Sequence, residues 1–99
     1  MKITITGTVS HIGEFKQAGA SEVREVVLHK MYHDPDTGAL KGEDYYPVQI
    51  WKDRYIDFEK AYHTSAKLEI KGFVNGRKIE KDGKASHYLN LTGREFRPL

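Results

Sequence analysis

The segment DYYPVQIWKDRYIDFEKAYH, residues 44–63, changes its hydrophobic spacing half-way along. In its first half every second position carries an apolar or aromatic residue, at Tyr46, Val48 and Ile50. A period of two is typical of a strand, and it predicts one over residues 44–52. Beyond that point the alternation is lost, so we expect the chain to enter a different kind of element.

The second half of the same segment predicts a short helix. Tyr55, Phe58 and Tyr62 are spaced at i, i+3 and i+7, which places the three rings on one helical face. Asp53 has the residue type of an N-cap, and the helical spacing ends near His63.

Alternation returns on both sides of this segment. Strands are predicted over four further ranges: residues 2–12, 24–33, 66–80 and 85–97. In the second of these ranges Val26, Val27 and Leu28 are adjacent, so the pattern does not decide which side of that strand faces the core. Each of the other ranges has one clear apolar side.

The connections are polar and rich in turn residues. Residues 13–23 and 34–43 are predicted as loops, and Asp82-Gly83 carries a hairpin signal. The order of elements is therefore strand, strand, strand, helix, strand, strand. In a chain of 99 residues this order predicts a single domain with the OB-fold, an all-β, five-stranded Greek-key barrel with one helix between strands three and four.

A barrel has one interior, and the apolar sides of the strands should fill it. The expected interior residues are Ile3, Ile5, Val48, Ile50, Leu68, Ile70, Leu89 and Leu91. The helix is expected to close one end of the barrel with Tyr55, Phe58 and Tyr62. Phe15, in the first predicted loop, is expected to act as a lid on the barrel.

Composition excludes several classes of protein. The absence of cysteine excludes disulfides, zinc fingers and thiol catalysis, and the scattered histidines predict neither a metal site nor a cofactor. No apolar run reaches the roughly 18 residues of a membrane span, and the alternating start is unlike a signal peptide, so a cytoplasmic protein is expected. No phosphate-binding glycine loop and no G-x-S-x-G motif is present, and Asp53, Asp57 and Glu59 are explained by capping and solvation, so we expect no enzyme.

Charge is distributed unevenly along the chain. The net charge is +2, but residues 1–59 hold seven basic and ten acidic side chains, whereas residues 60–99 hold nine basic and four acidic ones. The basic C-terminal part fits a polyanionic partner, although a solvated surface would look the same.

Four strand aromatics are predicted to face away from the interior. They are Tyr45, Trp51, Phe73 and Tyr88. Cations are interleaved with them or follow on the last hairpin: Lys52, Arg54, Lys67, Lys71, Arg77, Lys78, Lys81, Lys84 and Arg94. Unpaired bases stack on such rings at roughly 1–3 kcal/mol per base while cations contact the phosphates. This set predicts a site for single-stranded DNA, and RNA would offer the same stackable bases.

Two alternatives stay open at this point. The same aromatics could be buried in a homo-oligomer interface or in the core, because interfaces are enriched in these residue types. The whole face could instead dock a partner protein, which would make the chain an interaction module. The cations of the last hairpin could simply solvate the tip of that hairpin, without binding a ligand.

The sequence resembles the single-stranded DNA-binding protein family of bacteria and phages. The matching segments are Ile3-Thr4-Ile5-Thr6-Gly7-Thr8-Val9, residues 45–52, Leu68-Glu69-Ile70-Lys71-Gly72-Phe73-Val74 and Tyr88-Leu89-Asn90-Leu91. The resemblance implies non-enzymatic, largely sequence-independent binding of single-stranded DNA in replication, recombination or repair. It also implies that Tyr45 and Trp51 stack bases, that the hairpin at residues 75–86 tracks DNA, and that the protein forms a homo-dimer or homo-tetramer.

The chain also departs from that family. Lys52 follows Trp51 where the family has glycine, and Thr64-Ser65-Ala66 stands where Lys-Gly is common. Bacterial members end in an acidic tail that recruits other enzymes, whereas this sequence ends at Phe96-Arg97-Pro98-Leu99, so no such recruitment is expected. In this respect the sequence is similar to the small primosomal OB proteins.

Overall fold

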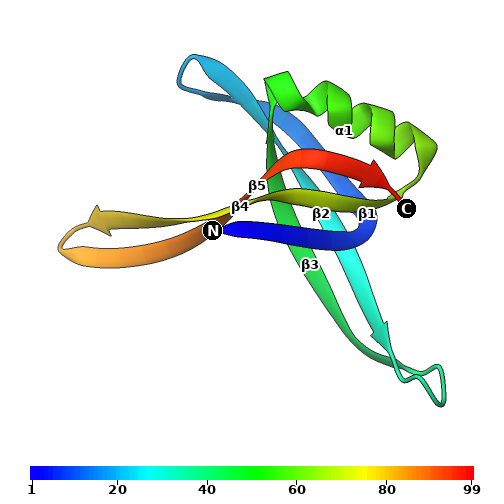
Figure 1. The fold of residues 1–99 in the computed structure, drawn as a ribbon. Coiled ribbons are helices and arrows are strands. Elements are labelled where there is room, and N and C mark those ends of the chain that lie inside the picture. Colours follow the sequence, from blue (N-terminus) through cyan, green and yellow to red (C-terminus); the bar gives the residue numbers. More distant parts are fainter.

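The computed structural model describes all residues, 1–99, as five strands and one helix (Figure 1). In chain order they are β1 Lys2–Ala18, β2 Ser21–His33, β3 Leu40–Trp51, α1 Lys52–Thr64, β4 Lys67–Lys81 and β5 Lys84–Pro98. The strands form a closed barrel in the order β1-β2-β3-β5-β4, with α1 between β3 and β4. The predicted OB-fold is therefore confirmed.

One junction of the barrel differs from the others. The pairs β1–β2, β2–β3, β1–β4 and β4–β5 are antiparallel. β3 and β5 are parallel and meet in only two register pairs, Val48 with Leu91 and Gln49 with Thr92. This short contact closes the barrel, and the two strands diverge on leaving it, as Figure 1 shows.

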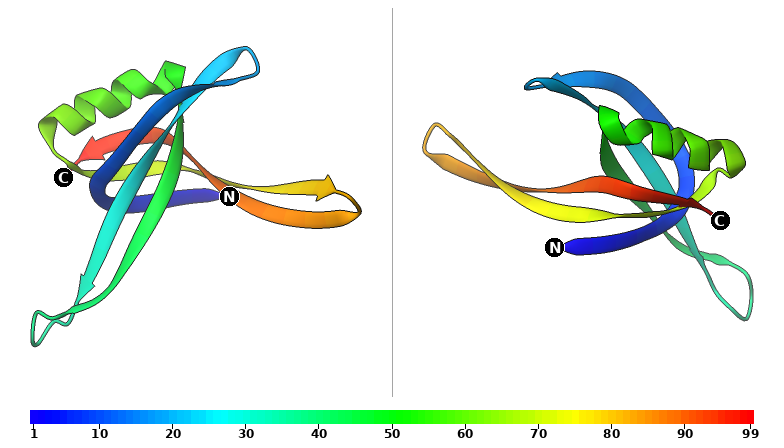
Figure 2. Two further views of the ribbon diagram at one scale, coloured as in Figure 1. Left: turned by 180° about the vertical axis from the view of Figure 1, so that it is seen from behind. Right: turned by 45° about the horizontal axis from the view of Figure 1, so that its top comes forward.

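The strands run further than the hydrophobic pattern predicts. The predicted loop over residues 13–23 is mostly a continuation of the β1–β2 ladder, with a turn at residues 19–20. Residues 40–43 likewise pair with the end of β2, so the second loop is reduced to residues 34–39. Backbone pairing in these hairpins continues where the side chains are polar, which is why alternation could not reveal it. Figures 1 and 2 show three hairpins that extend from the barrel in different directions.

The barrel interior contains most of the residues expected there. Val48, Ile50, Leu68 and Ile70 are buried, while Ile3, Ile5 and Leu91 are partly buried. β2 adds Val26 and Leu28, both fully buried, which settles the side that the sequence left open. Because hydrophobic burial contributes about 25 cal/mol per Å², this set supplies most of the stability of so small a protein.

The prediction for Leu89 is wrong. Leu89 follows the inward row of β5, but it lies on the protruding part of the β4–β5 hairpin and 76% of its surface is exposed. The alternating pattern continues past the point where the barrel ends, so the period alone could not show that nothing covers this position.

The helix N-cap lies two residues before the predicted N-cap, Asp53. Trp51 is the N-cap residue and makes no side-chain cap hydrogen bond, whereas Asp53 lies in the first turn, where its charge interacts favourably with the helix dipole. Phe58 is fully buried and Tyr55 nearly so, and both close one end of the barrel as expected. Tyr62 covers Phe58 with parallel rings 5.7 Å apart, but 37% of it remains exposed.

A cation–π contact joins the β1–β2 hairpin to the helix. The Arg24 guanidinium lies 4.6 Å from the ring centre of Phe15 and 4.9 Å from that of Tyr55, and its Nε donates to the Gly13 carbonyl. Phe15 also packs edge-on against Tyr55, with ring centres 5.1 Å apart. Phe15 therefore covers the helix-capped end of the barrel, as a lid would.

β4 and β5 approach each other very closely at Gly72. A Cβ atom on Gly72 would overlap the backbone carbonyl of Thr92, which cannot move aside as a side chain could. A register shift occurs at the same place and leaves Arg94 without a partner.

We expect Gly72→Ala to lower the free energy of unfolding by about 3 kcal/mol, because the added methyl must force two paired backbones apart. Gly76→Ala is the matched control in the same strand. Nothing lies within 4 Å of a Cβ there, so a change within about 0.5 kcal/mol is expected. Urea unfolding of the two variants measures the difference, and equal stabilities would contradict this account of the β4–β5 contact.

Candidate nucleic-acid interface

The outer surface of β3 carries the first predicted aromatics. Because Val48 and Ile50 point inward, the alternate residues of β3 form an outer row: Tyr45, Pro47, Gln49 and Trp51. Across the β2–β3 ladder they pair with His29, Val27, Glu25 and Val23 in that order, without a bulge at Pro47.

Tyr45 is held in a stack that the sequence did not reveal. Its ring lies parallel to that of His29, with centres 4.6 Å apart and planes 10° apart, and His29 Nε2 lies 3.2 Å from Glu43 Oε1. Tyr45 is still 58% exposed, so ring surface is left for a ligand. The sequence pattern does not single out His29, because it leaves the orientation of β2 undecided. The pairing of His29 with Tyr45 in the ladder is the signal that identifies it.

Trp51 is less exposed than Tyr45. It is the last residue of β3 and the N-cap of α1, and its side chain is half-buried. The indole therefore lies at the edge of the outer surface of β3, next to the helix.

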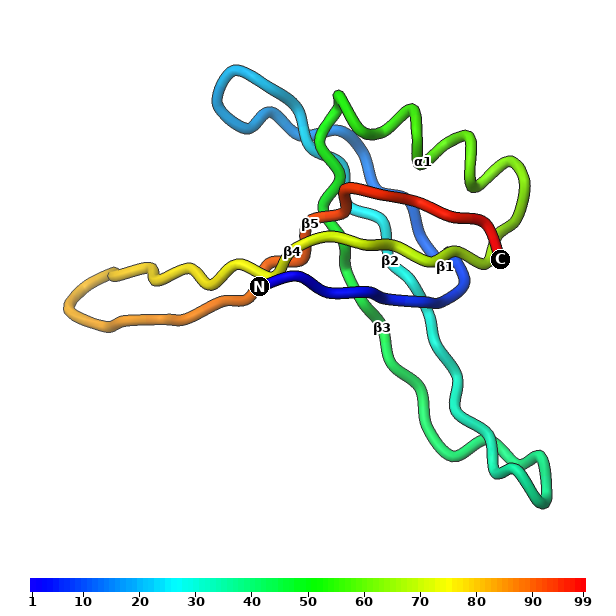
Figure 3. Tube along the Cα trace, in the orientation of Figure 1, coloured from blue at the N-terminus to red at the C-terminus, as the bar shows by residue number.

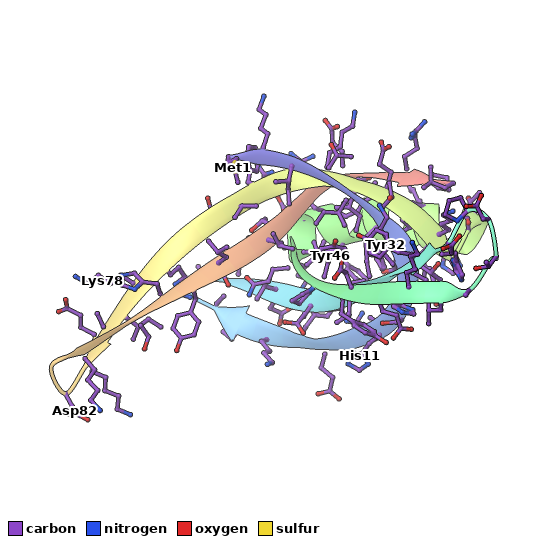
Figure 4. The ribbon with its side chains drawn as sticks, turned by 90° about the horizontal axis from the view of Figure 1, so that it is seen from below. Met1, His11, Tyr32, Tyr46, Lys78 and Asp82 are labelled. Atoms are coloured by element: carbon purple, nitrogen blue, oxygen red, sulfur yellow. The ribbon has the colours of Figure 1, made fainter.

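The β4–β5 hairpin presents a second set of aromatics. Its outer row holds Phe73, Asn75 and Arg77 on β4, opposite Thr92, Asn90 and Tyr88 on β5. Phe73 is 36% exposed and Tyr88 is 52% exposed. Arg77 pairs directly with Tyr88, and Lys81 and Lys84 continue the same row to the tip. Figure 4 shows this hairpin reaching away from the barrel, with Asp82 at its end.

These two surfaces are continuous. Gln49 of β3 pairs with Thr92 of β5, and Thr92 pairs with Phe73 of β4, so the outer rows of three strands meet side by side. The short β3–β5 junction thus brings Tyr45 and Trp51 onto the same outer surface as Phe73 and Tyr88. We call this surface, defined by the outer rows of β3, β5 and β4, the aromatic saddle.

The predicted cations are distributed over more than one surface. Lys71, Phe73 and Arg94 share an open hollow of about 420 Å³ with Lys2 and Thr4. Lys78 lies on the opposite face of the hairpin from Arg77 and is paired with Glu80 at 2.8 Å. Three predicted cations remain. Lys52 and Arg54 belong to α1, where Lys52 is paired with Glu22 at 3.2 Å and Arg54 is half-buried. Lys67 is the first residue of β4 and is exposed.

Polar side chains on the inner side of the β2–β3 hairpin form a separate network. The Tyr46 hydroxyl donates to Asp44 at 3.1 Å and lies 3.4 Å from the Tyr32 hydroxyl (Figure 4). The hydrogen bond to Tyr46, followed by that to Asp44, raises the pKa of Tyr32 above its ordinary value, so this phenol stays neutral. In the loop that follows, backbone N–H groups of Asp36 and Thr37 lower the pKa of Asp34.

Two further features bear on the class of protein. No group of three or more His, Asp or Glu side chains is arranged so that it could hold a metal ion. The single helix, of 13 residues, is neither long nor apolar enough to cross a membrane.

No protein-family model matches the chain, and no curated protein matches its sequence. Solved structures do match. The mitochondrial single-stranded DNA-binding protein from S. cerevisiae is 17% identical with a TM-score of 0.67, and the match covers 100% of this chain and 94% of that one. The Plasmodium falciparum protein in complex with single-stranded DNA is 18% identical with a TM-score of 0.60, covering 95% and 86%.

The fold is that of the single-stranded DNA-binding proteins. The wild-type protein from Thermus aquaticus has the same fold, with a TM-score of 0.69 at 14% identity, and this chain spans 49% of that protein. At such identities the match concerns the arrangement of the strands and helix. The roles of Tyr45, Trp51 and the other predicted site residues rest on the surface described above.

We expect a double-mutant cycle of His29→Ala and Tyr45→Ala to give a coupling energy of about 0.5–1 kcal/mol, because the two rings stack across the β2–β3 ladder. A cycle of Tyr45→Ala with Tyr88→Ala is the control, since no contact joins these two side chains. Urea unfolding supplies the free energies. Equal coupling in the two cycles would show that the stack does not stabilise the protein.

Proposed function

We propose that this protein binds single-stranded DNA on the aromatic saddle, largely without regard to base sequence and without catalysis. The observation that carries the proposal is the continuity of the saddle, on which Tyr45, Phe73 and Tyr88 are exposed beside free cations. The fold supports the same conclusion, because matching structures are described as single-stranded DNA-binding proteins, one of them in complex with DNA.

Base stacking supplies the first part of the binding energy. Each ring on the saddle accepts the flat face of an unpaired base at roughly 1–3 kcal/mol, whichever base it is. Tyr45 is already oriented by His29, so little freedom is lost when a base stacks on it. Paired bases present no free faces, and duplex DNA should therefore bind poorly.

Phosphate contacts supply the second part. Lys71 and Arg94 lie beside Phe73, and Arg77 lies opposite Tyr88, so each of these two rings has a cation within reach of the adjoining phosphate. Lys81 and Lys84 extend this row along the hairpin and have no carboxylate partner. Lys78 and Lys52, which are ion-paired, contribute less in this proposal.

The proposed setting is DNA replication, recombination or repair in the cytoplasm. A homo-dimer or homo-tetramer is part of the proposal, and exposed Leu89 supports it, because this leucine faces away from the saddle and has no cover within one chain. RNA is the alternative ligand, since its bases stack equally well.

A titration with oligo-dT tests this function. We expect Tyr45→Ala to weaken binding by about tenfold to 100-fold, the equivalent of one lost stack. Tyr62→Leu is the matched control, because Tyr62 lies on α1 and a leucine there would still cover Phe58 with apolar atoms. The affinity of this variant for oligo-dT should equal that of the wild type. Quenching of Trp51, the single tryptophan, reports binding.

The same titration is run in parallel with oligo-rU and duplex DNA. A higher affinity for oligo-dT than for duplex DNA supports the proposal. The ratio of the affinities for oligo-dT and oligo-rU decides between DNA and RNA. A folded wild-type protein that binds neither single strand at low salt would refute it.

A further inference from the structure

A second hollow lies outside the aromatic saddle, where β1 bends. Its volume is about 300 Å³, and its walls come from the bend in β1, the outgoing end of β2 and the first residue of β4. The side chains that matter are Thr6, Thr8, His29, Lys30, His33 and Lys67. We call this hollow the β1-bend pocket.

Three strands meet at this pocket because β1 turns sharply there. Thr8 pairs both with His29 of β2 and with Lys67 of β4. β2 crosses so close to the bend that a Cβ on Gly7 would lie 2.9 Å from the His29 carbonyl oxygen. Figure 3 shows the bend in the blue part of the chain, beside the cyan strand that leaves the barrel.

The pocket is basic, and none of its wall residues is acidic. Neither Lys30 nor Lys67 has a carboxylate within 4.0 Å, and Lys30 Nζ donates to Thr6 Oγ1 at 3.3 Å. The carboxylates of nearby segments already have partners: Glu43 lies against His29, Asp34 against Lys41 and Glu69 against Arg97. The two lysines thus leave local positive charge without a partner.

We propose that the β1-bend pocket binds a phosphate group of the DNA backbone. The walls offer ammonium groups, hydroxyls and imidazoles but no Tyr, Trp or Phe ring, and this set of groups suits a phosphate oxygen. The inference rests on the proposed function and extends it, because the pocket residues of β1 and β2 lie outside the saddle.

His29 connects this pocket to the saddle. The same imidazole lines the pocket and stacks on Tyr45, so a base on Tyr45 and a phosphate in the pocket would belong to neighbouring parts of one strand. The DNA would then leave the saddle past Tyr45 towards the β1 bend, at the side of β2 away from the β4–β5 hairpin.

The test uses the salt dependence of oligo-dT binding. We expect the double variant Lys30→Gln with Lys67→Gln to reduce the log–log salt slope by about 1.4, the value for two lost contacts to a single strand, and to weaken binding roughly tenfold to 30-fold at about 0.1 M salt. Lys60→Gln, an unpaired lysine on α1, should leave slope and affinity unchanged. Lys30→Arg with Lys67→Arg should retain the slope, because the charge is kept.

A second measurement separates DNA from free phosphate as the source. Amide shifts of Thr8 and Lys67 are followed by NMR with oligo-dT, and separately with inorganic phosphate against chloride at equal ionic strength. Shifts with oligo-dT alone assign the pocket to the DNA backbone. Saturable shifts with inorganic phosphate as well show that the pocket takes the free ion too.

The outcomes distinguish this inference from the proposed function. If the wild type binds oligo-dT but the double variant keeps its slope and neither titration shifts these amides, the pocket is refuted and the saddle stands. If inorganic phosphate shifts them and DNA does not bind, the saddle is refuted and the pocket is an anion site of another kind. If the wild type does not bind oligo-dT and inorganic phosphate does not shift these amides, both the pocket and the saddle are refuted.

Discussion

The barrel depends on a junction of two residue pairs. Val48 pairs with Leu91 and Gln49 pairs with Thr92, and these are the two register pairs that join β3 to β5. On the inner side they bring the two strands to one core. On the outer side they join the row of β3 to the rows of the β4–β5 hairpin, so the same contact that closes the fold also makes one continuous outer surface out of two.

Sequence predicted the fold because the core strands obey a strict period. Val48 and Ile50 fix the inward side of β3, and the outward direction of Tyr45 follows from them without further information. The helix was equally clear, since Phe58 and Tyr55 repeat at helical spacing and are buried. The first residue of the helix was not, because the N-cap is Trp51, which makes no side-chain cap hydrogen bond and is not a typical capping residue.

What the sequence could not predict was the extent of the strands and the contacts across them. Leu89 continues the pattern of the interior but lies beyond its end, and a period carries no information about where a barrel stops. His29 depends on the register of β2 against β3, which three adjacent apolar residues concealed. The β1-bend pocket joins three strands that are distant in sequence, so no local pattern contains it.

The β4–β5 hairpin has no layer of protein beneath its outer half, and its side chains there are exposed. Its ladder is therefore held mainly by its own cross-strand hydrogen bonds, and it can open while the barrel stays intact. Insertion or deletion of whole cross-strand pairs would leave the core untouched. The reach of this hairpin, and with it the length of any ligand that lies along it, can thus change during evolution independently of the folding of the barrel.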